Sequence, residues 1–254
     1  MSGLLRQVAV VAAALVNVGL NALAGAGVLF GTPTGAVSDA HPTGVTPAGW
    51  AFSVWTVIFV GVLVFAGWQA RPGARGPRYD RLAAPFVAAN VLNGLWRIPW
   101  LTGRLGVAAV VIVGILASLV WLYVRLDRMG LRGAERWALG VPASLFLGWV
   151  AVATALNVSV ALRATGWEAD GVLWPAAVVV LVAAVGAWLL WRTGDAALAL
   201  VLLWAYAAIA ARADQAAFLP VLLVCAVALV GSAVVGARRH SPFPTAHAEG
   251  AASG

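Results

Sequence analysis

The chain has 254 residues, of which 63% are apolar and only 10% are charged, whereas soluble domains have about 45–50% apolar and about 25% charged residues. This composition excludes a water-soluble globular protein. It predicts an all-α integral membrane protein, a polytopic bundle of transmembrane helices whose main partner is the lipid bilayer. All sixteen basic residues are arginine, but they lie between long apolar runs instead of along one stripe, so we expect no binding of nucleic acid. The single cysteine, Cys225, lies in an apolar run, which excludes a disulfide framework.

Eight segments are predicted to span the membrane, because a helix needs about 20 residues to cross the hydrocarbon core. In chain order they are Val8–Phe30, Trp50–Ala70, Ala83–Leu101, Leu105–Leu126, Trp137–Leu162, Val172–Trp191, Ala196–Ala211 and Ala216–Ala237. The first is longer than the apolar core of a signal peptide, so we expect it to be a mature helix. The seventh is short, and a re-entrant hairpin with the eighth is left open as an alternative.

Arginines are concentrated in particular breaks between these segments. The break after the second helix carries Arg71, Arg75, Arg78 and Arg81, the break after the fourth carries Arg125, Arg128, Arg132 and Arg136, and the last helix is followed by Arg238 and Arg239. Residues 31–49 and 165–171 contain no arginine, and the turn at 102–104 contains one. Because arginine-rich short loops stay cytoplasmic, we predict a multi-pass protein of the cell membrane with both termini in the cytoplasm.

Two segments are predicted to lie outside the membrane as irregular chain. Residues 31–49 form the one extended non-helical stretch expected between helices, and Pro33, Pro42 and Pro47 limit its freedom. Since loops of this length are usually functional or disordered, we predict a lid on the extracytoplasmic side, with a passive connector as the alternative. Residues 240–254 are small, polar and rich in glycine and alanine, which predicts a disordered cytoplasmic tail.

Polar side chains inside the predicted helices indicate a site, because an amide or a charge at membrane depth is costly unless it faces a partner or a cavity. They recur at helical spacing on three helices: Asn17 and Asn21 on the first, Asn90, Asn93 and Arg97 on the third, and Thr154, Asn157 and Ser159 on the fifth. Aromatic residues of the second and third helices lie at a similar depth: Trp50, Phe52, Trp55, Trp96 and Trp100. The predicted topology places this whole group in the extracytoplasmic half.

These residues predict a cavity with flat apolar walls, a few hydrogen-bond donors and one cation, suited to a planar, amphipathic small-molecule ligand that is either neutral or anionic. Alternatives stay open for single residues. Asn17 and Asn157 could equally join helices through hydrogen bonds, and Arg97 could extend to the outer headgroups.

Three ordered motifs resemble those of one known family. Residues 46–59, TPAGWAFSVWTVIF, resemble the Pro-x-x-Trp-x-Phe…Val-Trp-Thr signature that opens the second helix of the tryptophan-rich sensory protein family, the TspO (TspO/MBR) or translocator proteins. Residues 92–96, LNGLW, are similar to the Leu-Asn-x-x-Trp of its third helix, and residues 149–157, WVAVATALN, resemble the Trp-Val-x-Phe-Ala-x-x-Leu-Asn of its fifth. The resemblance covers about residues 8–162.

The resemblance implies a five-helix bundle around a pocket that is closed by the first loop and binds porphyrins, haem or, in eukaryotic members, steroids. The chain then divides into a TspO-like bundle at 1–164, three additional transmembrane helices at 165–239 and the tail at 240–254. Together, the motifs and the depth argument predict ten ligand-binding residues: Asn21, Trp50, Phe52, Trp55, Asn93, Trp96, Arg97, Trp149, Thr154 and Asn157.

The predicted function is therefore the binding of a flat, porphyrin-like amphiphile, for sensing or handling. We expect no enzyme, no metal site and no firmly held cofactor, with porphyrin or haem only as the ligand, since the sequence has no phosphate-binding glycine loop, no pair of histidines at metal spacing and no nucleophile–base set. A transporter of a small hydrophobic or anionic solute is the alternative, and a structural role for the tryptophans is a third reading. Whether the chain forms a homodimer is left open.

Overall fold

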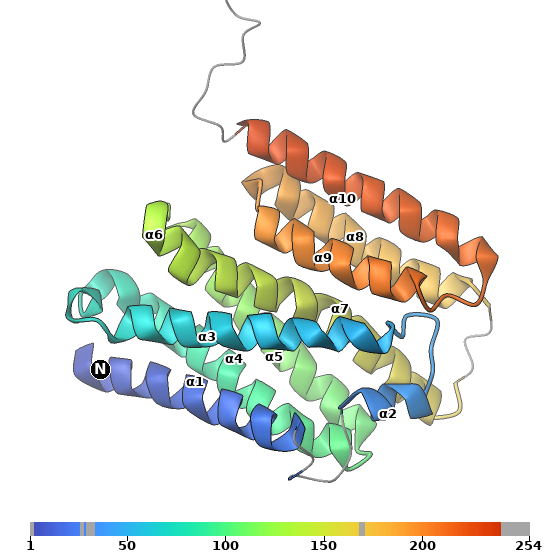
Figure 1. Cartoon of the computed structure of the whole chain (residues 1–254), viewed down its shortest axis with the longest axis horizontal. Helices are drawn as coiled ribbons and strands as arrows, with labels where there is room; N and C mark the ends of the chain where they lie inside the picture. The colour runs from blue at the N-terminus through green and yellow to red at the C-terminus, as the bar shows by residue number, and fades with distance from the viewer. Residues whose placement is uncertain (1–2, 26–27, 29–33, 168–170, 240–254) are drawn as a thin grey trace, which may run out of the picture.

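The computed structural model describes residues 3–25, 28, 34–167 and 171–239, and these residues form helices and connecting turns without a β-strand (Figure 1). The long helices are α1 Gly3–Gly25, α3 Val54–Ala70, α4 Pro77–Leu101, α5 Leu105–Asp127, α7 Val141–Ala164, α8 Leu173–Thr193, α9 Ala196–Ala210 and α10 Leu219–Arg239. Short elements complete the described chain: α2 Thr34–Ala40, η1 Gly49–Ser53, η2 Pro72–Ala74, α6 Gly133–Glu135, the π-turn η3 Arg136–Gly140 and η4 Ala216–Phe218. The predicted polytopic helical bundle is confirmed, and each of the eight predicted segments overlaps one long helix, although α1 and α4 begin five and six residues before the predicted starts.

The helix boundaries follow from local sequence. Pro77 stands in the first turn of α4, where its missing N–H is not needed. Gly194 ends α8 in the left-handed conformation with φ of 60°, as is typical after a helix C-terminus. Asp195 then caps α9, because its carboxylate accepts hydrogen bonds from the amides of Ala197 and Leu198 at 3.1 Å.

The arginine-rich breaks lie together at one end of the bundle, called here the arginine end (residues 71–81, 127–136 and 194–195, with the C-terminus of α10). Arg6 of α1 is buried there, donates to the carbonyl of Ala74 and pairs with Asp80 at 2.7 Å. Arg78 pairs with Glu135 at 2.8 Å. The opposite end, called the first-loop end, carries residues 34–48. Which end faces the cytoplasm stays a prediction.

Six of the eight segments are long and apolar enough to cross a membrane: those of α1, η1 with α3, α5, α6 with α7, α8, and η4 with α10. The helix α9 is shorter, with 15 residues. It nevertheless connects the two ends, since Asp195 before it contacts Tyr123 at the arginine end, and Arg212 after it pairs with Asp39 at the first-loop end. This course differs from a re-entrant hairpin.

The helix α4 falls outside the six because it is rich in polar residues. Its Asn90, Asn93 and Arg97 are nevertheless buried against other helices, where hydrogen bonding reduces the cost of their polarity. Mean hydropathy alone therefore underestimates how far this helix is buried within the bundle.

The prediction that residues 31–49 contain no helix is wrong, because α2 occupies Thr34–Ala40. A helix of seven residues is marginal on its own. Here α2 packs near α4, buries Ser38 and places Val37 against the core, so tertiary contacts stabilise it. Residues 29–33, with the end of the first predicted helix, and the tail at 240–254 lie outside the described residues.

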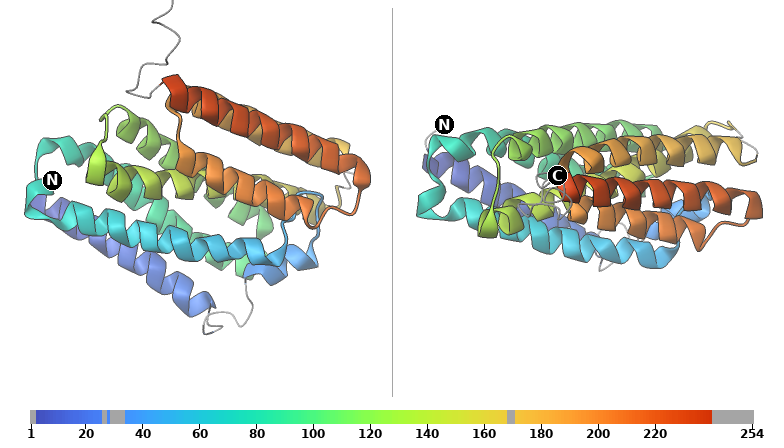
Figure 2. Two further views of the ribbon diagram at one scale, coloured as in Figure 1. Left: turned by 45° about the horizontal axis from the view of Figure 1, so that its top comes forward. Right: turned by 90° about the horizontal axis from the view of Figure 1, so that it is seen from above.

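The helices form two groups that lie side by side (Figures 1 and 2). One group contains α1, α3, α4, α5 and α7, and the other contains α8, α9 and α10. They meet mainly where α7 packs on α9. A Cβ added at Gly148 of α7 would lie 2.4 Å from Val201 Cγ1, so a glycine is needed for this close approach. The division of the chain into two domains at residue 164 stays a prediction.

Candidate functional site

An aromatic cavity lies between α3, α4 and α7, beneath the first loop. Its lining residues are Ser38, Pro47, Phe52, Trp55, Trp96, Trp100, Trp149, Val152, Ala153, Leu156 and Asn157. The open volume is about 20 Å³, room for about one water molecule. The structure therefore shows this cavity in a closed form.

The aromatic rings of the cavity hold one another in place. Trp149 meets Trp55 edge to face, with ring centroids 6.3 Å apart, and meets Phe52 in the same manner at 5.9 Å. Trp96 and Trp100, one helical turn apart on α4, stack at 5.3 Å. Such contacts add to the free energy of burial alone, so the walls are flat and firmly positioned.

Asn157 gives the cavity a polar group with a fixed orientation. Its side-chain oxygen accepts a hydrogen bond from Trp96 Nε1 at 2.9 Å, while its amide nitrogen donates to the carbonyl of Ala153 at 2.8 Å. Asn157 thereby joins α7 to α4 at the cavity wall, and it orients the indole of Trp96.

Two buried donors in the lining have no hydrogen-bond partner among the described residues. They are Ser38 Oγ of α2 and Trp149 Nε1 of α7, and their residues are only 1% and 2% exposed. A buried polar group without a partner costs about 1–3 kcal/mol. A guest that offered acceptor atoms to these donors would recover that free energy, so the pair is a candidate for ligand recognition.

A second polar cluster lies between α1 and α4, outside the cavity. At its centre, Asn17 donates to Asn90 Oδ1 at 2.8 Å and accepts from Asn21 at 2.8 Å and from Asn93 at 2.9 Å. Arg97 Nε donates to Asn21 Oδ1. All five side chains are buried, so this network joins two helices through hydrogen bonds.

The ten predicted ligand-binding residues therefore occupy several places. Five of them line the cavity: Phe52, Trp55, Trp96, Trp149 and Asn157. Asn21, Asn93 and Arg97 belong to the α1–α4 network. Trp50 is 47% exposed and packs against Trp204 of α9 at 4.7 Å, and the Thr154 hydroxyl donates to the carbonyl of Val150. A ligand-binding role for each of the ten stays a prediction.

Some lining residues had only a weak signal in the sequence or none. Trp100 was recognisable, because it follows Trp96 by four residues and so shares its helix face. Pro47 and Ser38 lie in the first loop, where no periodicity shows which side chains turn inward. Val152, Ala153 and Leu156 resemble the other apolar residues of α7.

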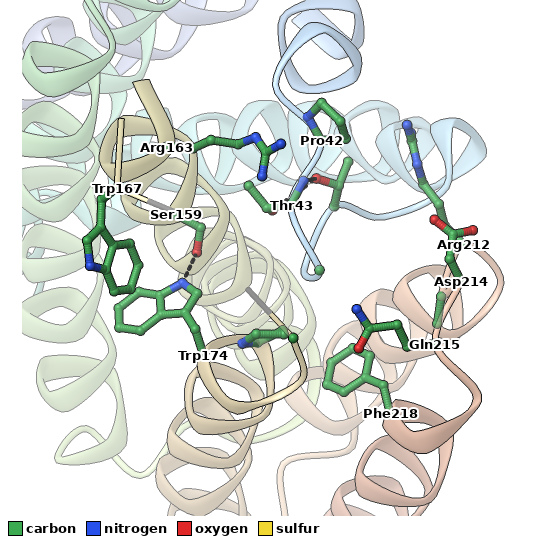
Figure 3. Close-up of a pocket in the computed structure, with 15 residues that line it drawn as sticks. Pro42, Thr43, Ser159, Arg163, Trp167, Trp174, Arg212, Asp214, Gln215 and Phe218 are labelled. Carbon is green, nitrogen blue, oxygen red and sulfur yellow. Dashed lines mark hydrogen bonds between the residues drawn. The ribbon is translucent and has the colours of Figure 1, made fainter. Parts of the chain in front are cut away.

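A larger cavity, of about 360 Å³, lies at the first-loop end where the two helix groups meet (Figure 3). Pro42, Thr43, Gly44 and Thr46 of the first loop form one part of its lining, and the ends of α7, α8 and the α9–α10 turn form the rest. Trp174 Nε1 donates to Ser159 Oγ at 3.0 Å in this lining. The aromatic and arginine side chains of this lining are not among the predicted ligand-binding residues.

The first loop and η1, which follows it, are fastened to α9 and the turn after it by several contacts. The amide of Ala48 donates to the carbonyl of Ala208 at 2.9 Å, and Trp204 Nε1 donates to the carbonyl of Ala51 at 3.1 Å. Asp39 of α2 forms its ion pair with Arg212. Because Ser38 and Pro47 of the same loop line the aromatic cavity, α9 and the turn after it hold one wall of that cavity in place.

These features define a multi-pass helical membrane protein with a closed aromatic cavity near one end. The model of a protein family described as "TSPO-like protein" matches residues 7–237, and the chain therefore belongs to this family. The predicted limit of the resemblance at about residue 162 is therefore wrong, because the match also includes α8, α9 and α10 as far as residue 237. Comparison with curated proteins and with solved structures gave no match.

Proposed function

We propose that this protein binds a flat amphiphilic ligand of the porphyrin type in the aromatic cavity, for sensing or handling. The observation that carries the proposal is the pair of buried donors without partners, Ser38 Oγ and Trp149 Nε1, within walls of Phe52, Trp55 and Trp96. Flat rings stack on such walls, and the two donors suit an acceptor group such as a carboxylate or carbonyl.

Binding of a ligand of this size requires the cavity to open. Pockets for small molecules have volumes of about 300–1,000 Å³, whereas this cavity has about 20 Å³. The aromatic residues on α3, α4 and α7 are held by ring contacts and by Asn157. The first loop contributes only Ser38 and Pro47 to the lining, so displacement of this loop is the opening motion that disturbs the fewest ring contacts.

A titration of purified protein with protoporphyrin, followed by the absorbance of the porphyrin, tests the proposal. We expect saturable binding that is weakened about tenfold by Trp149→Phe, because this change keeps an aromatic ring at the site but removes the N–H donor. Ser38→Ala is expected to weaken binding by a similar factor. Trp121→Phe is the matched control, since Trp121 lies 45% exposed on the outer face of α5.

Two results would count against the proposal. One is the absence of saturable binding by the wild-type protein. The other is equal weakening by Trp149→Phe and Trp121→Phe, which would indicate general adsorption to tryptophan-rich surfaces.

We propose transport of a small hydrophobic or anionic solute as the second candidate, on a different observation. Cavities lie at both ends of the contact between the two helix groups. One is the 360 Å³ cavity at the first-loop end, and the other, of about 170 Å³, is lined at the arginine end by Tyr123, Ser144 and Asp195, among others. Between them α7 and α9 are in close contact at Gly148.

Counterflow of radiolabelled phthalate, a small aromatic anion, into liposomes that contain the protein tests this candidate. Transport predicts uptake above that of protein-free liposomes, and a loss of that uptake in Gly148→Val, where the added side chain would clash with Val201. Uptake equal to that of protein-free liposomes would reject transport of this solute class.

A further inference from the structure

A hollow at the arginine end, between the start of α4 and the end of α5, is lined by four arginines and two other residues. Its volume is about 420 Å³, and its lining consists of Pro77, Arg78, Arg81, Arg125, Arg128 and Met129. The two helices pack side by side (Figures 1 and 2). No acidic side chain belongs to this lining in the described part of the chain.

The four arginines reach the hollow because of their spacing. Arg78 and Arg81 are three residues apart on α4, and Arg125 and Arg128 are three residues apart at the end of α5. Residues at this spacing share one helix face. Each helix thus directs a pair of guanidinium groups to the same hollow, which lies at the end of the predicted membrane spans.

One of the four arginines is neutralised and fixed. Arg78 donates to Glu135 at 2.8 Å and to the carbonyl of Met129 at 3.3 Å, which joins α4 to the segment after α5. Arg81 and Arg128 are exposed and have no hydrogen-bond or ion-pair partner among the described residues, and Arg125 lies 6.0 Å from the ring of Trp121. Three cations therefore share one hollow without a counter-charge in its lining.

Such an arrangement is suited to a phosphate oxyanion. Guanidinium groups form charge-assisted, bidentate hydrogen bonds with phosphate, and a bound anion relieves the repulsion between neighbouring arginines. Basic pockets between transmembrane helices near the cytoplasmic surface are suited to lipid headgroups. The hollow opens at the end of α5, which is long and apolar enough to cross a membrane, and phospholipid phosphates lie at the ends of such spans.

We propose that this hollow, called the arginine hollow, binds the headgroup of an anionic phospholipid, with its phosphate held by Arg81, Arg125 and Arg128. A preference of arginine for the cytoplasmic side explains basic residues at this end. It does not explain why these four converge while Arg132 and Arg238, near the same end, lie outside the lining. The site is separate from the aromatic cavity and does not depend on the function proposed for it.

Native mass spectrometry of the full chain tests the proposal. The protein in a neutral detergent is titrated with dioleoyl-phosphatidylglycerol, with dioleoyl-phosphatidylcholine and with inorganic phosphate. The test variant is Arg81→Gln with Arg128→Gln, in which both side chains are exposed and the fold is not at risk. The matched control is Arg132→Gln with Arg238→Gln, which removes the same charge from the same end.

We expect saturable binding of phosphatidylglycerol that is tighter than that of phosphatidylcholine and is weakened roughly ten- to thirtyfold in the test variant. The control variant is expected to bind like wild type. Equal weakening in both variants would overturn the proposal, because it would show diffuse attraction to net charge. Inorganic phosphate that binds as tightly as the lipid would also overturn it and assign the hollow to a free anion.

Discussion

The five-helix group and the three-helix group are stabilised in different ways. All buried arginine, asparagine, glutamine, serine and threonine side chains among the described residues lie between Arg6 and Ser159. In the three-helix group, the buried hydroxyl of Tyr206 in α9 donates to the carbonyl of Val179 in α8. Apart from this hydrogen bond, the three-helix group relies on close approach at small residues. A Cβ added at Gly186 would lie 2.7 Å from Leu202 Cδ1, and one added at Gly236 would lie 2.1 Å from the carbonyl oxygen of Leu190.

The two groups therefore illustrate two requirements of a membrane bundle, which are to hold helices together and to orient particular side chains. Shape complementarity at small residues can hold helices together with few polar groups. This way of packing is sufficient for the three-helix group, whose contacts with the rest of the chain support α7 and the first loop. Buried hydrogen bonds are costly if they are incomplete, but they orient helices and side chains. The five-helix group, which contains the aromatic cavity, has most of them.

The largest expected effect tests the close packing of the three-helix group. Gly236→Val places a branched side chain against the backbone of α8 and of Gly194, which cannot move aside as a side chain can. We expect a loss of about 3 kcal/mol in the free energy of unfolding, measured by denaturation in mixed micelles. Gly231→Val is the control, because no atom lies within 4 Å of a Cβ added there. Equal losses in the two variants would show that helix propensity, not packing, is responsible.

A smaller effect tests the hydrogen-bonded network of the five-helix group. Asn17→Leu removes the partner of Asn90, Asn21 and Asn93 together. At about 0.6 kcal/mol for each hydrogen bond between membrane helices, we expect a loss of about 2 kcal/mol in the same assay. Thr165→Val should change little, since its hydroxyl bonds only to the carbonyl of Leu162 at an exposed helix end. A change below about 0.5 kcal/mol in Asn17→Leu would mean that the network orients the helices without stabilising them.

The smallest expected effect tests the junction between the groups. Trp204→Phe keeps an aromatic ring against Trp50 but removes the hydrogen bond to the carbonyl of Ala51. We expect the free energy of unfolding to fall by about 1 kcal/mol, and we expect local opening of the first loop to become more frequent. Hydrogen exchange at the amide of Ala48 should accelerate, while exchange within α5 stays unchanged. Uniform acceleration across the chain would indicate general destabilisation and would contradict a fastening role for α9.

The helices were largely predictable because membrane thickness sets their length and arginine marks their connections. The small helix α2 was not, since a seven-residue helix with polar members has no distinct pattern. The cavity was predictable in part. Depth along a helix and relative rotation about its axis follow from residue number, but the neighbouring helix that each face meets does not. On α4 the side chains of Asn93 and Trp96 are at similar depth, yet Asn93 bonds to Asn17 while Trp96 lines the cavity.

The small volume of the aromatic cavity also has a consequence for rates. If a guest must wait for the first loop to leave its contacts with Ala208 and Trp204, association proceeds through a minor open population. The observed on-rate should then approach a plateau as ligand concentration rises, and the plateau equals the rate of loop opening. A complex formed in this way is long-lived, because the same loop must open again before the guest can leave, so residence time and not affinity alone would set the duration of a signal.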